Sequence, residues 1–239
     1  LAHVAARRGY GLVLTMPDLP SLAPAVKLLG HLGARVELTP AVEGSRGSII
    51  RAREIVRAVP GAVMTDQFAN PFNPAAHEST ACEIWRDCAG AIDCLIIGIG
   101  SGGTLTGCAR FLKRHRPELQ VIGVEPSTCA VVAGEAPARH GIIGLGPGFV
   151  PEVLDLSLID EIVKVPDTLA VEVARLAVRL ENIAGGLSTG ANLAAALTIA
   201  ARPEMQGRRI VTLAPSPAER YGASMLFDPI DEADLGGRT

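Results

Sequence analysis

The sequence predicts an α/β protein with two domains, each built on an open, mostly parallel, twisted sheet flanked by helices. Short apolar segments alternate with amphipathic ones along the chain, and this alternation is typical of βαβ units and hence of parallel sheets. Hydrophobic residues make up 48% of the 239 residues, which is enough for one large or two small cores. Only 3% of the residues are aromatic, so the core is expected to be aliphatic.

Charge and hydropathy exclude several classes of function. The chain has 22 Lys and Arg against 25 Asp and Glu, a formal net charge of -3, so it presents no basic field for nucleic acid or an anionic membrane. It has no uncharged apolar run of membrane-spanning length, and its first residues are too polar for a signal peptide. These features favour a cytoplasmic protein that acts on a small molecule.

The cysteines and histidines predict neither a disulfide framework nor a metal site. The cysteines are odd in number and lack Cys-x-x-Cys spacing, so they are expected to be reduced and buried. The histidines are scattered, with no His-x-x-x-His pair and no cluster at ligand spacing. The residues concerned are Cys82, Cys88, Cys94, Cys108 and Cys129, and His3, His31, His77, His115 and His140.

Residues 1–70 predict a small α/β domain. An amphipathic stretch at its start predicts the back half of a helix, which Gly9 ends. In the last helix of this domain Ile49, Ile50, Ile55 and Val56 are expected to face inward. Strands are expected at 11–16 and 34–39, and further helices at 25–32 and 48–57.

The boundary between the two domains is expected in the loop 67–74. This loop contains two Asn-Pro steps, and a residue that precedes proline disfavours helical backbone. The next helix is therefore expected to begin only at His77, and the second, larger domain comprises residues 71–239. In that domain strands are expected at 93–97, 120–126, 161–165 and 209–213, and helices at 77–88, 105–114, 167–180 and 191–201.

Two segments of the larger domain have less regular patterns. Residues 128–140 predict a short helix followed by a loop. Residues 141–149 are too rich in glycine for regular structure. They form either a mobile segment that closes over a site or a plain connector.

The richest functional signal is a glycine-rich turn between a strand and a helix. Five glycines fall within residues 98–107, so backbone amides are uncovered and the following helix directs its first N–H groups into the turn, as in an anion site. The turn is not a P-loop, because no Gly-Lys-Ser/Thr follows, and it matches a dinucleotide fingerprint or a Gly-x-Ser-x-Gly hydrolase elbow only in part. Tight strand-to-helix packing without a ligand remains an alternative.

Two other turns follow predicted strands or open helices in the same domain. Residues 188–190 lie in the turn before the predicted helix 191–201, and Ser216 follows the last predicted strand. Ligands of open α/β sheets bind at the carboxyl ends of the strands, so residues 98–104, 188–190 and Ser216 can share one crevice.

Residues 98–107 resemble the phosphate loop of the pyridoxal-phosphate enzymes of fold type II, and most closely that of the cysteine synthases (O-acetylserine sulfhydrylases). Further motifs of that family follow in the same order over nearly the whole chain, including Gln-Phe-x-Asn-Pro-x-Asn-Pro-x-x-His and Pro-Ser-x-Gly-Glu-Arg-Tyr, in which Ala218 replaces the glycine. The matching segments are 30–34, 67–77, 83–85, 144–151, 186–191 and 215–221.

The resemblance implies a cofactor, pyridoxal 5'-phosphate, and a role for each matching residue. Amides and hydroxyls of the glycine loop would bind the cofactor phosphate, and Ser216 would face its pyridine nitrogen. Gln67 would bind the substrate carboxylate, and the segment 144–146 would close over the substrate. The residues carried over are Gly100, Ser101, Gly102, Gly103, Thr104 and Ser216 for the cofactor, and Gln67, Gly144, Leu145 and Gly146 for the substrate.

The resemblance also implies a reaction and partners. The reaction is a β-replacement in cysteine biosynthesis, in which O-acetylserine and sulfide give cysteine and acetate. A homodimer is the family expectation, and the C-terminal tail of serine acetyltransferase is a further partner. A related enzyme with another nucleophile, such as cystathionine β-synthase, is an alternative.

The family's Schiff-base lysine has no counterpart in this sequence. Its segment lies upstream of the region that matches Leu1, and the three lysines present, Lys27, Lys113 and Lys164, lack its context. No catalytic residue is therefore assigned. The favoured interpretation is a truncated, N-terminally incomplete synthase, and the alternative is an inactive short paralogue that acts as a binding or scaffold protein.

Overall fold

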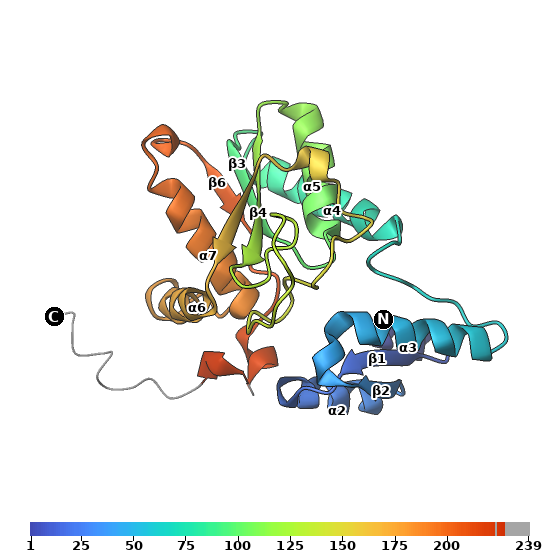
Figure 1. The fold of residues 1–239 in the computed structure, drawn as a ribbon. Helices are drawn as coiled ribbons and strands as arrows, with labels where there is room; N and C mark the ends of the chain where they lie inside the picture. The colour runs from blue at the N-terminus through green and yellow to red at the C-terminus, as the bar shows by residue number, and fades with distance from the viewer. Residues whose placement is uncertain (223, 228–239) are drawn as a thin grey trace.

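The computed structural model describes residues 1–222 and 224–227. It contains two separate sheets, one of two strands and one of four, and every strand pair is parallel (Figure 1). The α/β class is therefore confirmed. The small sheet consists of β1 (Val13–Pro17) and β2 (Arg35–Thr39), and the large sheet of β3 (Cys94–Gly98), β4 (Gln120–Pro126), β5 (Glu161–Val165) and β6 (Ile210–Thr212).

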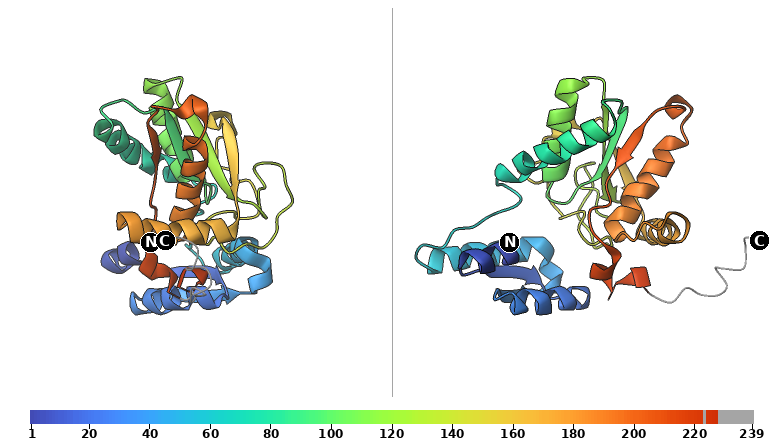
Figure 2. Two further views of the ribbon diagram at one scale, coloured as in Figure 1. Left: turned by 90° about the vertical axis from the view of Figure 1, so that its left-hand side faces the viewer. Right: turned by 180° about the vertical axis from the view of Figure 1, so that it is seen from behind.

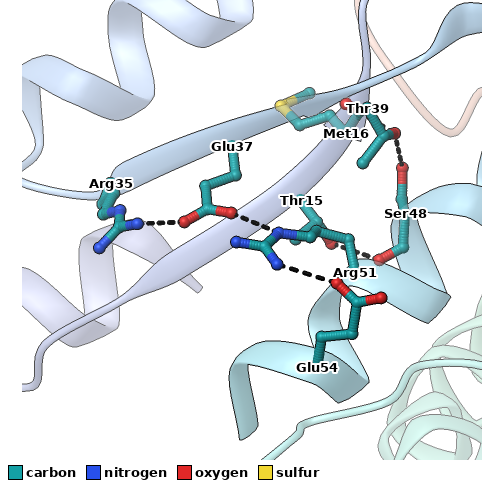
Figure 3. A network of polar contacts seen from close by, with 8 residues as sticks. All are labelled: Thr15, Met16, Arg35, Glu37, Thr39, Ser48, Arg51 and Glu54. Carbon is teal, nitrogen blue, oxygen red and sulfur yellow. Dashed lines mark hydrogen bonds and ion pairs between the residues drawn. The ribbon is translucent and has the colours of Figure 1, made fainter. Parts of the chain in front are cut away.

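The small sheet packs against helix α3 (Gly44–Ala58) through a polar network (Figure 3). The Thr15 hydroxyl donates to the Ser48 carbonyl oxygen over 2.8 Å, and the hydroxyls of Thr39 and Ser48 lie 2.9 Å apart. Arg51 of the same helix donates to Glu37 of β2 over 2.7 Å. These polar contacts tie α3 to both strands of the small sheet. Helices α1 (Ala2–Arg8) and α2 (Ala23–His31) complete this part of the chain.

Two sequence predictions concern helices α1 and α3. Gly9 ends α1 in the left-handed conformation with a φ of 71°, as predicted. The inward orientation of Ile50 is wrong, because this side chain is 50% exposed. Ser48 is buried, and a residue two positions later lies about 200° around the helix, on the opposite face.

Helices cover both faces of the large sheet (Figures 1 and 2). Helices α4 (Phe72–Asp87) and α5 (Gly103–His115) form one apolar core with the sheet, and α6 (Asp167–Glu181) and α7 (Leu187–Ala200) form another. The central strand β3 contributes Leu95 to the first core and Ile96 to the second. A strand buried on both faces explains the continuous apolar run in the sequence.

Glycines allow the helices on each face to cross closely. A Cβ atom on Gly107 of α5 would lie 2.1 Å from the Pro74 carbonyl oxygen of α4. A Cβ atom on Gly190 of α7 would lie 1.9 Å from the Ala170 carbonyl oxygen of α6. Both crossings therefore require glycine, and both fix helices that begin at the carboxyl edge of the sheet.

Three sequence predictions need correction. Helix α4 begins at Phe72, five residues before the predicted start. Pro74 is tolerated because amides of the first helical turn have no partner within the helix. Residues 128–140 form turns and contain no helix, and the carboxylate of Glu125 accepts the Val132 amide over 3.0 Å there. The described cysteines are all free, but Cys82 is exposed and Cys88 is half-buried, so the expected burial is confirmed only for Cys94, Cys108 and Cys129.

The strand order of the large sheet creates a switch point beside β3. The order is β5-β4-β3-β6, so the chain runs outward from β3 through β4 to β5 and then returns to the other side of β3. The carboxyl ends of these strands point toward the part of the chain that carries β1 and β2 (Figure 1). A crevice at the carboxyl ends of β3 and β6 is the expected ligand site. Within the described residues, no helix is long and apolar enough to cross a membrane.

Candidate functional site

A cavity of about 250 Å³ lies at the carboxyl ends of β3 and β6. Four segments that are distant in the sequence form its walls: the glycine loop after β3, the segment 144–145, the start of α7 and the segment after β6. Its lining residues are Ile97, Gly98, Gly100, Ser101, Gly102, Thr104, Gly144, Leu145, Ser188, Asn192, Leu213, Pro215, Ser216 and Tyr221.

Most of the residues predicted for the site lie together in this cavity. Of the predicted cofactor contacts, all but Gly103 line it, and Gly103 is the first residue of the adjoining helix α5. Ser188 also lines it, as expected of a shared crevice. Of the predicted substrate contacts, Gln67 and Gly146 are not among the lining residues.

The glycine loop forms a cradle that packs too closely against its neighbours for its glycines to carry side chains. Gly102 has a φ of 84°, a left-handed conformation that favours glycine. A Cβ atom on Gly100 would lie 2.4 Å from the Gly144 carbonyl oxygen, and one on Gly103 would lie 2.0 Å from Asn73 Oδ1. The first amides of α5 have no intrahelical acceptor, so the cradle offers N–H donors to an anion.

Asn73 of α4 forms hydrogen bonds that join the glycine loop to the segment before α4. Its Nδ2 atom donates to Ser101 Oγ over 2.9 Å and to the Gln67 carbonyl oxygen over 2.7 Å. The amide of Gly103 lies 3.5 Å from the same Ser101 oxygen. Because the hydroxyl already accepts from Asn73, the proton of Ser101 is available to a ligand.

His77 holds the second hydroxyl of the loop. Its Nε2 atom lies 3.1 Å from Thr104 Oγ1, and its Nδ1 atom lies 3.3 Å from Thr80 Oγ1. Burial lowers the pKa of His77 below its usual value, which favours the neutral ring with one N–H donor. If Thr80 donates to Nδ1 and Nε2–H donates to Thr104, the proton of Thr104 is directed to the cavity.

Ser216 is held at the opposite wall by two contacts. Its Oγ atom lies 2.7 Å from the Tyr221 hydroxyl, and its carbonyl oxygen accepts the Gly186 amide over 2.9 Å. The ring of Tyr221 packs on Gly186, where a Cβ atom would lie 2.1 Å from a ring carbon. The backbone and the hydroxyl of Ser216 are therefore both positioned by buried groups.

Asn192 presents an unused acceptor at the cavity wall. Its Nδ2 atom donates to the Leu213 carbonyl oxygen over 2.9 Å, which fixes the orientation of the amide. Its Oδ1 atom has no hydrogen-bond partner among the described residues, although Asn192 is only 2% exposed. A buried acceptor of this kind requires a donor from a bound molecule or water.

The segment 144–146 is tied to the glycine loop by backbone contacts. The amide of Gly146 donates to the Ile99 carbonyl oxygen over 3.0 Å, and His140 Nε2 lies 3.0 Å from the Gly146 carbonyl oxygen. Gly144 and Gly146 have φ values of 100° and 55°. Gly144 and Leu145 of this segment line the cavity, and the conformation of the segment depends on glycine.

The residues of this cavity fit pyridoxal 5'-phosphate. Hydroxyls and amides in the cradle suit the phosphate, the orphaned Asn192 oxygen needs a donor, and none of the described lining residues carries a charge. No lysine lines the cavity: Lys113 pairs with Asp160 over 2.8 Å, and Lys164 pairs with Glu135. The described residues therefore fit non-covalent binding.

Some of these residues were not assigned roles from the sequence. Asn73, His77 and Tyr221 fall within recognised motifs, but the motifs do not reveal which hydroxyl each one contacts. Asn192 lies one helical turn after Ser188, so the i, i+4 spacing was the available signal. The orientation of the Asn192 amide depends on its hydrogen bond to the Leu213 carbonyl oxygen, and only the fold reveals this contact.

Comparison with known proteins gives the same assignment. Residues 1–216 match the family model described as "Pyridoxal-phosphate dependent enzyme". Cysteine synthase A of Salmonella typhi is 43% identical, and the match covers 98% of this chain and 76% of that protein.

Solved structures of this family have the same fold. The cysteine synthase of Entamoeba histolytica matches with a TM-score of 0.90 and 35% identity, over 96% of this chain and 68% of that one. The O-acetylserine dependent cystathionine β-synthase of Helicobacter pylori matches with a TM-score of 0.88 and 33% identity, over 95% of this chain and 74% of that one. The chain therefore belongs to the pyridoxal-phosphate dependent enzyme family, has the type II fold, and is related to the cysteine synthases.

Proposed function

We propose that the cavity binds pyridoxal 5'-phosphate, with the phosphate in the cradle of residues 100–104 and the pyridine ring toward Ser216. The supporting observation is the cradle itself, in which glycines, the hydroxyls of Ser101 and Thr104 and the start of α5 border a space without charged side chains among the described lining residues. A phosphate with two negative charges is favoured there by N–H donors and by the helix dipole.

The residues around the proposed cofactor site favour loss of a substituent from the β-carbon of an amino acid. When bound, pyridoxal phosphate acts as an electron sink for a substrate carbon from which a proton is removed. Ser216 offers a neutral hydroxyl to the ring nitrogen, which leaves that nitrogen unprotonated and suits loss of a β-substituent. Gly144 and Leu145 line one side of the cavity and would exclude water from that side of the ring.

The reaction that this arrangement supports best is β-replacement in cysteine biosynthesis, from O-acetylserine and sulfide to cysteine and acetate. Gln67 binds the substrate carboxylate in this proposal. Its position is compatible with that role because Asn73 ties its backbone to the glycine loop, and the neighbouring Phe68 packs on Phe149 with ring centroids 5.0 Å apart. A carboxylate between these segments would bring the substrate to the cavity mouth.

A second candidate differs in the nucleophile. A cystathionine β-synthase has the same fold at a similar level of identity, so the architecture is compatible with a thiol amino acid as well as sulfide. An inactive binding or scaffold protein is the remaining alternative. Product analysis with sulfide and with homocysteine would separate these candidates.

The proposal extends to organisation and context. We place the boundary between a small domain and the larger, cofactor-binding domain near residue 70, in the segment between α3 and α4. A cytoplasmic homodimer that binds the C-terminal tail of serine acetyltransferase is the arrangement expected of this family.

The cofactor proposal is tested by removing one hydroxyl without changing side-chain shape. We expect Thr104→Val to weaken binding of pyridoxal 5'-phosphate about tenfold or more, because a hydrogen bond to a charged acceptor is worth about 1.5–3 kcal/mol. Calorimetric titration measures the affinity. Thr198→Val is the matched control, since the Thr198 hydroxyl bonds, among the described residues, only to the Ala194 carbonyl oxygen of its own helix. Equal affinities for the two variants, or no binding by the wild-type chain, would contradict the proposal.

A further inference from the structure

We infer that Tyr221 is a positioning residue that directs the Ser216 hydroxyl toward an acceptor atom on the bound ring. This inference rests on the proposed cofactor site and assigns a role to a residue outside the phosphate cradle. Both side chains line the cavity, and their oxygens lie 2.7 Å apart. The distance is that of a short hydrogen bond between hydroxyls.

One hydrogen bond joins the two hydroxyls, and its direction decides whether Ser216 presents a donor or only an acceptor to the ligand. Each hydroxyl has one proton and can also accept. If Tyr221 donates to Ser216, the proton of Ser216 is free and the cavity presents a donor. If Ser216 donates to Tyr221, the cavity presents only lone pairs at Ser216.

The surroundings favour donation by Tyr221. A phenol is more acidic than an aliphatic alcohol and is the stronger donor of the two. The ring cannot turn away, because Tyr221 is only 8% exposed and lies against Gly186 at a distance that excludes any Cβ atom there. The Ser216 backbone is fixed as well, since its carbonyl oxygen accepts the Gly186 amide.

The consequence is a preference for one state of the ligand ring. A ring nitrogen with a free lone pair accepts the Ser216 proton and completes a chain from the Tyr221 hydroxyl through Ser216 to the nitrogen. A protonated ring nitrogen would need an acceptor and would force the pair to reverse. Tyr221 therefore acts on the ring nitrogen through Ser216, in addition to packing on Gly186.

The test combines Tyr221→Phe with a ligand that lacks the ring nitrogen. Phenylalanine keeps the ring and its packing on Gly186 and removes only the hydroxyl. The two ligands are pyridoxal 5'-phosphate and its 1-deaza analogue, in which C–H replaces the ring nitrogen. Binding is measured by calorimetric titration, after thermal unfolding has established that the variant folds.

The inference predicts a loss that depends on the nitrogen. Tyr221→Phe should weaken binding of pyridoxal 5'-phosphate about three- to tenfold, as expected for one neutral hydrogen bond, and leave binding of the deaza analogue unchanged. Ser216→Ala should give the same pattern, and the double variant should lose little more than Ser216→Ala alone.

Other outcomes separate this inference from the cofactor proposal. Equal loss for both ligands, or no loss for either, would show that Tyr221 only packs and would overturn the inference while the cofactor site stands. Thr104→Val should weaken both ligands alike, because it acts on the phosphate. Failure of the wild-type chain to bind either ligand would instead refute the cofactor site on which the inference rests.

Discussion

At the scale of single residues, each hydroxyl of the site depends on a neighbouring polar side chain. Asn73 supports Ser101, His77 supports Thr104 and Tyr221 supports Ser216, each over 3.1 Å or less. Asn73 donates to Ser101 and so leaves the proton of that hydroxyl available to the cavity, whereas the direction of the other two contacts depends on the His77 tautomer and on which of the Tyr221 and Ser216 hydroxyls donates. The electrostatics of the site are therefore set by neutral dipoles, in keeping with the absence of charge among the described lining residues.

The neutral state of His77 predicts how stability depends on pH. Burial lowers the pKa of His77 in the folded protein below the usual value near 6.5, so the unfolded chain binds more protons in that interval. The stabilisation is fully present above about pH 6.5 and is lost as the pH falls through the folded pKa. In His77→Gln, the free energy of unfolding should decline less as the pH falls from 6.5 to 5, as measured by urea titration. An unchanged decline would contradict the role given to His77.

At the scale of elements, glycine contacts set the relative position of α4 and α5, which carry His77 and Thr104. Gly107→Ala should destabilise the protein by about 2 kcal/mol or more, because the added Cβ atom would lie 2.1 Å from the Pro74 carbonyl oxygen. Gly30→Ala in α2 is the matched control, since its Cβ atom would meet nothing within 4 Å, and it should stabilise by about 0.5–1 kcal/mol. Urea unfolding of both variants measures the difference, and similar effects would argue against a tight crossing.

Elements with a clear periodicity were predictable from the sequence. The strands β4 and β5 occupy the predicted residues, because their apolar runs are bounded by turn residues on both sides. The start of α4 was missed because the rule against helix before proline weakens in the first turn. Residues 128–140 were predicted to begin with a helix, but the Glu125 carboxylate accepts the Val132 and Ala133 amides and holds them in a turn. Glu125 lies seven residues before Val132, so local helix patterns do not reveal this contact.

The candidate site was predictable where it depends on local sequence. Glycines at a strand end indicate an anion cradle by themselves, and the structure brings most of the predicted cofactor contacts to one cavity. The acceptor of Asn192 and the position of Tyr221 depend on contacts between segments, with Leu213 and Gly186 respectively. Contacts between segments that are distant in the sequence produce no local pattern from which they can be predicted.

At the scale of the whole molecule, the two sheets belong to parts of the chain joined by one exposed segment (Figure 1). Residues 59–71 connect α3 to α4, and in this segment Val63 is 85% exposed. We predict that, within residues 1–222, limited digestion with subtilisin cuts first in this segment, because exposed connectors are the preferred sites of proteolysis. Mass spectrometry of the fragments locates the cut. A first cut within α5 or α7 would contradict the proposed boundary.

The central claim is that one cavity at the carboxyl edge of the large sheet holds pyridoxal 5'-phosphate between the glycine loop and Ser216. The most direct test is a titration of the isotopically labelled chain with this ligand, followed through the backbone amide resonances. The account predicts the largest shifts at the amides of residues 100–104, with further shifts at Ser216 and Asn192, and small shifts in residues 1–58. Unchanged resonances in the glycine loop, or shifts centred on another part of the chain, would contradict it.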